Sequence, residues 1–314
     1  MDMAFKQRLT YINFFIRNIP AFLKYKIFKK PRNLSHFCGE NGINLDYTNL
    51  VLNKALSTSS PFCAIRFGAV ELSCLNNHEK IELGFKHKYK DSVIYSMKNN
   101  AGFFPPTQKN LQKYGDTFLS ILNKVDYLGI SGAHMEDYFY SRYCKNATPI
   151  LYEGMEPLRG DWIKKLEGKN VLVVSSFAKE IETQYKKIDL IFNNERIVPK
   201  FNLMTVEAPL TLADETIEDS SFFELLSFLY KKIDSFDYDI ALIGAGAYGS
   251  FLAIHCKEKG KIGIQTGGAT PTMFGIMGKR WENRTHVSKY VNSYWIRPSR
   301  KPKGYEKIEK GAYW

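Results

Sequence analysis

The stretch that decides the fold is "DYDIALIGAGAYGSFLAIHCKEKGKIGIQTGG", residues 237–268. It starts with an apolar run typical of a buried strand. Gly244, Gly246 and Gly249 follow that run in the order G-x-G-x-x-G, and a helix is expected from about Ala247 to Lys259. Another apolar strand comes directly after the helix. A strand, a glycine-rich turn, a helix and a second strand make one crossover of a parallel sheet.

The same alternation of apolar runs and helical segments fills most of the chain. Further strands are expected at 62–66, 125–131, 148–154, the start of 168–192, and 201–209; helices are expected at 49–56, from about 71, over most of 87–123, and near 221–235. This pattern predicts an α/β fold, a Rossmann-like, mainly parallel sheet with helices on both faces, as one domain over residues 46–314. Ligands of such sheets bind in the loops that follow the strands.

The first 45 residues predict a basic amphipathic arm and a linker. Residues 1–33 hold eight Lys or Arg against one acid, which gives +7 of the formal net charge of +12, and many aromatic residues lie between them. Residues 1–30 therefore fit a helix on an anionic membrane surface, or equally a helix packed on the body with a solvated basic face. Nucleic acid is not expected, because the rest of the chain has no comparable basic stripe.

The composition indicates in which cellular compartment the protein is expected. Arg17 interrupts the best apolar run of the arm, so neither a membrane span nor a secretory signal is expected. The five cysteines are odd in number and none forms C-x-x-C, which disfavours disulfides and zinc. A cytoplasmic protein is predicted, peripheral on the inner face of the membrane if the arm binds lipid. Whether the chain forms a homo-oligomer is left open by the sequence.

The glycine loop fits either a dehydrogenase or another phosphate-binding protein. The strand after it ends in Gln265 and Thr266, where a ribose-binding acid of a dehydrogenase belongs. A second glycine loop, residues 266–281, leads to Lys279 and Arg280. Two glycine loops beside cations suit a diphosphate such as that of a sugar nucleotide.

Six stretches together resemble the bacterial GT-D fold glycosyltransferase-like family. They are "AIRFGAVEL" (64–72), "NNAGFFP" (99–105), "LEGKNVLVVSSFAKEIETQY" (166–185), "ALIGAGAYG" (241–249), "GGATPTMFGIMGKRW" (267–281) and "YEKIEKGAYW" (305–314). The resemblance implies a glycosyltransferase that moves a sugar from a nucleotide-diphosphate donor to a glycan or lipid-linked acceptor in bacterial cell-surface polysaccharide assembly. A nucleotide-dependent oxidoreductase and an inactive membrane-associated scaffold remain as alternatives.

In this family the first stretch resembles R-F-G-D-G-E, whose acidic pair lies at the metal and the donor diphosphate. Arg66, Gly68 and Glu71 match it, whereas Ala69 replaces the aspartate and Val70 a glycine. The resemblance therefore implies Glu71 as catalytic residue and as ligand of Mn²⁺ or Mg²⁺. The missing aspartate puts that metal in doubt.

The remaining candidate site residues are chosen mainly because they lie in or near loops that follow predicted strands. The acceptor base is sought among His134, Glu136 and Asp137, which follow the strand at 125–131. The donor site is expected to contain Arg66, Gly68, Ser176, Gly244, Gly246, Tyr248, Gly249, Gly267, Gly268, Ala269, Thr270, Lys279 and Arg280.

Overall fold

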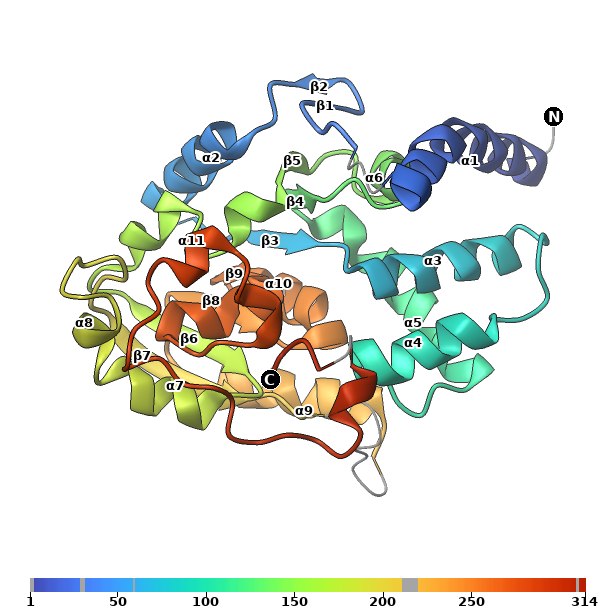
Figure 1. The fold of residues 1–314 in the computed structure, drawn as a ribbon. Coiled ribbons are helices and arrows are strands. Elements are labelled where there is room, and N and C mark those ends of the chain that lie inside the picture. The colour runs from blue at the N-terminus through green and yellow to red at the C-terminus, as the bar shows by residue number, and fades with distance from the viewer. Residues whose placement is uncertain (1–2, 29–31, 59, 211–219, 309–310) are drawn as a thin grey trace.

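The computed structural model describes residues 3–28, 32–58, 60–210, 220–308 and 311–314 (Figure 1). Its centre is a seven-stranded sheet in the order β5-β4-β3-β9-β8-β6-β7, and every neighbouring pair is parallel. The strands are β3 (Cys63–Arg66), β4 (Tyr127–Ile130), β5 (Thr148–Leu151), β6 (Asn170–Ser175), β7 (Asn202–Glu207), β8 (Ile240–Gly244) and β9 (Ile262–Ile264). The predicted α/β fold is confirmed.

Helices alternate with the strands, as predicted. They are α2 (Leu45–Ser57), α3 (Ala69–Glu82), α4 (Asp91–Ala101), α5 (Gln108–Ile121), α6 (Glu136–Tyr143), α7 (Ala178–Tyr185), α8 (Ile188–Ile191), α9 (Phe222–Asp234), α10 (Gly249–Glu258) and α11 (Thr285–Ser288). Side-chain caps fix several starts; the Thr107 hydroxyl, for example, accepts from the Asn110 N–H at 3.2 Å to begin α5. The second glycine loop forms the 3-10 helix η5 (Gly267–Phe274) instead of an α-helix.

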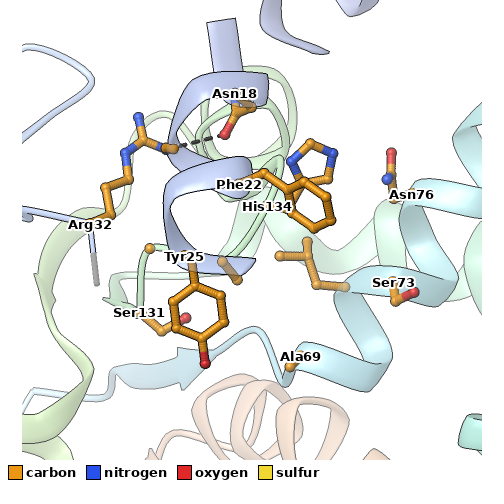
Figure 2. Close-up of a pocket in the computed structure, with 13 residues that line it drawn as sticks. Asn18, Phe22, Tyr25, Arg32, Ala69, Ser73, Asn76, Ser131 and His134 are labelled. Carbon is orange, nitrogen blue, oxygen red and sulfur yellow. Dashed lines mark hydrogen bonds between the residues drawn. The ribbon is translucent and has the colours of Figure 1, made fainter. Parts of the chain in front are cut away.

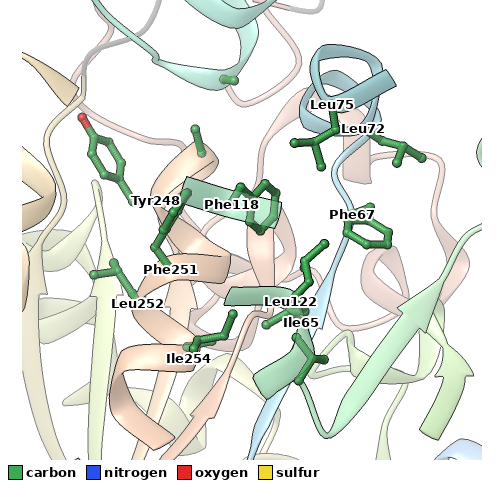
Figure 3. Packing of buried hydrophobic residues seen from close by; sticks show 14 of the residues in the cluster. Ile65, Phe67, Leu72, Leu75, Phe118, Leu122, Tyr248, Phe251, Leu252 and Ile254 are labelled. Atoms are coloured by element: carbon green, nitrogen blue, oxygen red, sulfur yellow. The ribbon is translucent and has the colours of Figure 1, made fainter. Parts of the chain in front are cut away.

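Both faces of the sheet are buried because successive strand residues point to opposite sides. On β8, Ala241 and Ile243 join the core that α3, α5 and α10 cover. Ile240 and Leu242 join the opposite core, beneath α2, α7 and η5. Figure 3 shows the first core, where Phe118 of α5 lies between α10 and β3; its ring centroid is 5.1 Å from that of Phe251. This two-sided burial explains why the strands read as continuous apolar runs.

The predicted arm is a single helix, α1 (Met3–Phe28), that packs on the body beside α6. Tyr11 is buried and its hydroxyl donates to Asn76 Oδ1 at 2.6 Å. Asn18 is buried too, and its amide donates to both Asp137 carboxylate oxygens at 2.9 and 3.1 Å. Residues 1–2 and 29–31 of the predicted arm lie outside the described part of the chain. No helix among the described residues has the length and apolar character needed to cross a bilayer.

The expected linker at 31–46 contains a small antiparallel hairpin. It consists of β1 (His36–Phe37) and β2 (Glu40–Asn41). Phe37 and Ile43 are buried in the same core as Tyr11. The segment therefore connects α1 to α2 along the surface of the body and is not a free spacer.

Candidate functional site

A cleft of about 250 Å³ lies at the carboxyl ends of β3, β6, β8 and β9. The direction of the strand order switches here. From β3, the next strands in the chain, β4 and β5, lie on one side, whereas β9 and β8 lie on the other side. Parallel sheets bind their ligands at such switch points. Nine predicted donor-site or catalytic residues line the cleft: Arg66, Gly68, Glu71, Ser176, Gly244, Gly246, Gly267, Gly268 and Arg280.

The three glycines of the first loop have separate roles. Gly246 has a φ of +51°, and a Cβ there would lie 2.9 Å from the Ala101 carbonyl oxygen. At Gly244 a Cβ would lie 2.7 Å from the Gly267 carbonyl oxygen, so glycine lets the two loops approach. Gly249 lies outside the cleft lining, and its Cβ would lie 2.7 Å from Gln265 Nε2. Glycine there permits close packing of α10 on the end of β9.

Arg66 is the main cation on the strand side of the cleft. Its guanidinium carbon lies 4.6 Å from the centre of the Tyr152 ring, and its Nη2 would lie 2.9 Å from a Cβ at Gly267. Its Nε is buried and has no hydrogen-bond partner among the described residues. A buried donor without a partner is costly, so this group is set up for an acceptor that the protein does not supply.

Asn100, at the end of α4, presents a second unpaired polar group to the same cleft. Its Oδ1 is buried and has no hydrogen-bond partner among the described residues. Since an amide oxygen accepts hydrogen bonds, a hydroxyl group of a ligand would satisfy it. Asn100 belongs to the stretch 99–105 that resembles the GT-D fold family, and no role for it was predicted from the sequence.

The C-terminal segment closes the other side of the cleft. The Arg280 Nη1 donates to the Tyr313 hydroxyl at 2.7 Å, and the Arg280 backbone N–H donates to the Ala312 carbonyl at 2.9 Å. Tyr313 and Trp314 line the cleft beside Arg280. Lys279 is exposed and outside the cleft lining, so the structure separates two neighbouring cations that were predicted to act together.

Glu71 is the single carboxylate side chain among the described residues that line the cleft. It is the third residue of α3, and a Cβ at Gly68 would collide with its carboxylate. The carboxylate therefore turns back over the N-terminus of its own helix, where the helix dipole favours negative charge. Mg²⁺ is usually bound by one or two carboxylates together with waters and substrate phosphates. With one carboxylate beside Arg66 and Arg280, the cleft offers too few protein ligands to hold a divalent ion before a phosphate ligand binds.

Four further candidates lie away from the cleft. Tyr248 is in the core, where its ring stacks on Phe222 at 4.5 Å between centroids. Ala269 and Thr270 are buried inside η5, and the Thr270 hydroxyl donates to the Gly267 carbonyl at 2.7 Å. Asp137 accepts from Asn18 and is 3.2 Å from the Arg32 guanidinium. The expectations that these four side chains face the donor or the acceptor are corrected by the structure.

A second cavity, the side pocket, has a volume of about 480 Å³ and lies between α1, α3 and the loop after β4. Figure 2 shows Phe22 and Tyr25 of α1 on one side of it and Ala69 at the start of α3 on another. Ala69 lines both the side pocket and the cleft, so the two cavities adjoin at this residue.

His134 lines the side pocket. Its ring centroid lies 5.6 Å from Phe15 and 5.1 Å from Phe22, and its Nδ1 is buried and has no hydrogen-bond partner among the described residues. Burial, and then the nearby Lys80 ammonium, lower the pKa of His134, while Asp137 raises it by less. The imidazole is therefore neutral at pH 7, the form that can accept a proton.

Glu136 supports the turn between β4 and α6. Its buried carboxylate accepts from the Ser131 and Gly132 backbone N–H groups at 3.0 and 2.7 Å. Burial raises the pKa of Glu136 to about 7, although these hydrogen bonds lower it. Of the three residues weighed as the base, only His134 reaches a cavity of the site.

The chain was compared with known proteins in three ways. No family model matches it, and neither the curated proteins nor the solved structures contain a match. Its function is therefore inferred from the geometry of the two adjoining cavities.

Proposed function

We propose that this protein is a glycosyltransferase that takes a sugar from a nucleoside-diphosphate donor. The observation that carries the proposal is the pair of unsatisfied groups in the cleft, the Arg66 Nε donor and the Asn100 Oδ1 acceptor. An anionic oxygen satisfies the first and a hydroxyl the second. A sugar nucleotide offers both kinds of group in one molecule, and the resemblance to the GT-D fold family supports the same reading.

The two arginines act on the leaving group. As the bond between the sugar and the diphosphate breaks, its electron pair stays on the diphosphate and negative charge grows there. Arg66 and Arg280 are held by Tyr152 and Tyr313, respectively, before the ligand binds. Cations that are already oriented stabilise developing charge without reorganising. This mechanism needs no step through a metal ion.

The side pocket is where the acceptor binds in this proposal. A transferase needs two substrates side by side, and Ala69 joins the two cavities. The acceptor hydroxyl loses its proton to the neutral His134 imidazole as its oxygen attacks the anomeric carbon. The reaction is balanced by departure of the nucleoside diphosphate with the electron pair.

The exposed surface of α1 supports an acceptor at a membrane. Ten of the seventeen exposed large apolar side chains of the described residues lie on α1. Among them, Ile16, Ile27 and Phe28 are 57%, 65% and 72% exposed. Basic residues such as Arg17 and Lys24 lie between them, a pattern that suits an anionic bilayer surface. A lipid-linked acceptor would be presented at that surface.

An oxidoreductase is less well supported. Gln265, at the position of a ribose-binding acid, is already used within the protein: its Oε1 accepts from the Arg66 N–H and from the Ser250 hydroxyl, both at 3.0 Å. It fixes the end of β3 against α10 and β9. A cofactor ribose would have to break these contacts.

A thermal-shift screen followed by calorimetry tests the proposal. Sugar nucleotides and nucleoside diphosphates should raise the melting temperature, with Mn²⁺ and with EDTA alike, because a ligand that binds only the folded state stabilises it. Donor hydrolysis in the same samples separates an active enzyme from a scaffold. A response to NAD(P)H alone would select the oxidoreductase, and complete loss of nucleotide binding in EDTA would contradict the arginine mechanism.

A further inference from the structure

Two turns beyond the cleft, α3 carries a group of ligand-type side chains that the proposed function does not use. His78 and Glu82 lie four residues apart on α3, and Asp116 faces them from α5. One donor atom from each lies within 4.8 Å of the others. None of the three lines the cleft or the side pocket.

The hydrogen bonds of His78 fix its tautomer. Its Nδ1 lies 2.8 Å from the Tyr89 hydroxyl, and that hydroxyl lies 3.0 Å from the Leu111 carbonyl oxygen. A phenol hydroxyl carries its proton at neutral pH. Since a carbonyl can only accept, that proton goes to Leu111, and His78 must donate from Nδ1. In the neutral ring, Nε2 then carries the lone pair.

The Nε2 atom lies near a carboxylate. His78 Nε2 lies 3.3 Å from Asp116 Oδ1. A charge-assisted hydrogen bond between these atoms would be shorter, at about 2.7–2.9 Å. Two ligands at about 2.0–2.2 Å from a tetrahedral zinc ion lie about 3.4 Å apart, which matches the observed separation. A cation between the two acceptors accounts for both the distance and the tautomer.

The surroundings hold the three ligands in place. His78 is 1% exposed, and its ring lies so close to α5 that a Cβ at Gly115 would collide with it. A glycine inside a helix costs about 1 kcal/mol relative to alanine, and here it gives the ring the room to lie beside Asp116. The Gln112 amide donates to Glu82 Oε1 at 2.6 Å and orients that carboxylate. Such outer contacts are typical of metal sites.

The site is open to solvent on the carboxylate side. Glu82 and Asp116 are exposed and border a surface cavity of about 400 Å³ with His78. Arg142, the one Lys or Arg among the described residues that line this cavity, lies 3.4 Å from Glu79 Oε1 and donates to the Tyr143 hydroxyl. An ion can therefore enter from water, and one position remains for a water ligand.

We propose that His78, Glu82 and Asp116 bind one divalent transition-metal ion, with Zn²⁺ as its best representative. One imidazole and two carboxylates are ligands that Zn²⁺ accepts, whereas Mg²⁺ and Ca²⁺ prefer oxygen alone. The ion links α3 to α5. Because α3 starts at the cleft, the ion also fixes the helix that positions Glu71.

Calorimetric titration of the full-length, chelator-stripped protein with Zn²⁺ tests the proposal. One equivalent should bind, and the melting temperature should rise with Zn²⁺. Glu82→Gln and Asp116→Asn each remove a ligand charge at an exposed position and should weaken Zn²⁺ binding at least tenfold. Asp161→Asn, an exposed carboxylate elsewhere, and Glu71→Gln, in the cleft, should bind as the wild type does.

Two outcomes would overturn the proposal. No binding of Zn²⁺ to the wild type would show that His78 and Asp116 form an ion pair instead and would overturn the proposal. Unchanged affinity in both Glu82→Gln and Asp116→Asn would overturn it too. Donor binding in the cleft is measured separately, so a failure of the zinc proposal is distinguished from a failure of the proposed function.

Discussion

Replacing Arg66 with methionine should weaken nucleotide binding while changing the stability of the fold only slightly. Methionine keeps much of the side-chain length against Tyr152 and Gly267 but removes the guanidinium. A hydrogen bond to a charged group contributes about 1.5–3 kcal/mol. Since each 1.4 kcal/mol is a factor of ten, the dissociation constant for a nucleoside diphosphate should rise about 10- to 150-fold.

The stability change is expected to be small because two effects oppose each other. The substitution removes the buried Arg66 Nε, whose missing partner costs about 1–3 kcal/mol in the ligand-free protein. It also removes the contact of the guanidinium with the Tyr152 ring, worth about 0.5–2 kcal/mol. The free energy of unfolding should therefore stay within about 1–2 kcal/mol of the wild-type value.

Two measurements on three proteins check this. Urea unfolding gives the stability and calorimetry gives the affinity of the wild type, Arg66→Met and Lys279→Met. Lys279 is the matched control, since it is a cation next to Arg280 but outside the cleft, and its loss should change neither quantity. Unchanged nucleotide affinity in Arg66→Met would refute the role of the cleft. A loss of stability above about 3 kcal/mol would show that Arg66 is a structural residue.

Three further predictions follow from other positions. Gly246→Ala should destabilise the fold by more than Gly260→Ala. Both residues have positive φ, but only at Gly246 would the new Cβ meet a backbone carbonyl, at 2.9 Å, whereas nothing lies within 4 Å at Gly260. Urea unfolding compares the two variants. The free energy of unfolding should fall by up to about 3 kcal/mol as the pH rises from about 4.5 to 7. The pKa of Glu136 is about 7 in the fold against 4.5 ordinarily, so the folded protein holds an extra proton in that window. Glu136→Gln should remove this slope. Ile16→Ser combined with Phe28→Ser should reduce sedimentation with anionic liposomes while sparing nucleotide affinity, because both side chains are exposed on α1.

Each of these has an outcome that contradicts it. Equal stability losses at Gly246 and Gly260 would mean that the contact with α4 is not tight. A wild-type pH profile with the same slope as that of Glu136→Gln would place the ionisation elsewhere. Undiminished sedimentation of the α1 double variant would show that its apolar face does not meet lipid. Substitution is a sharper test here than deletion of residues 1–30, since deletion would also uncover the core beneath Tyr11.

The sheet and most of the cleft could be predicted from local pattern. Apolar runs of strand length separated by helical segments define the parallel sheet, and its switch point then gathers the loops that follow β3, β6, β8 and β9. Gly244, Gly267 and Arg66 reach the cleft for that reason. The direction of each side chain within a loop could not be predicted in this way.

That direction depends on contacts far away in the sequence. Tyr248 lies within the glycine loop but its ring stacks on Phe222, and Asp137 is held by Asn18, 119 residues before it. Conversely, Asn100 and Tyr313 reach the cleft from segments that follow no strand. Neither kind of placement has a signature in local periodicity, since both are decided by how helices and the C-terminal segment pack on the finished sheet.

Helix α1 has one face on the side pocket and another in contact with solvent. Asn18, Phe22 and Tyr25 form part of the pocket wall, while Ile16 and Phe28 point outward. A shift of α1 on a bilayer would therefore change the shape of the pocket, and a ligand in the pocket would change how α1 meets the bilayer. Linkage requires the two effects to be equal in free energy. If a vesicle tightens acceptor binding by some factor, the acceptor must tighten binding to the vesicle by the same factor.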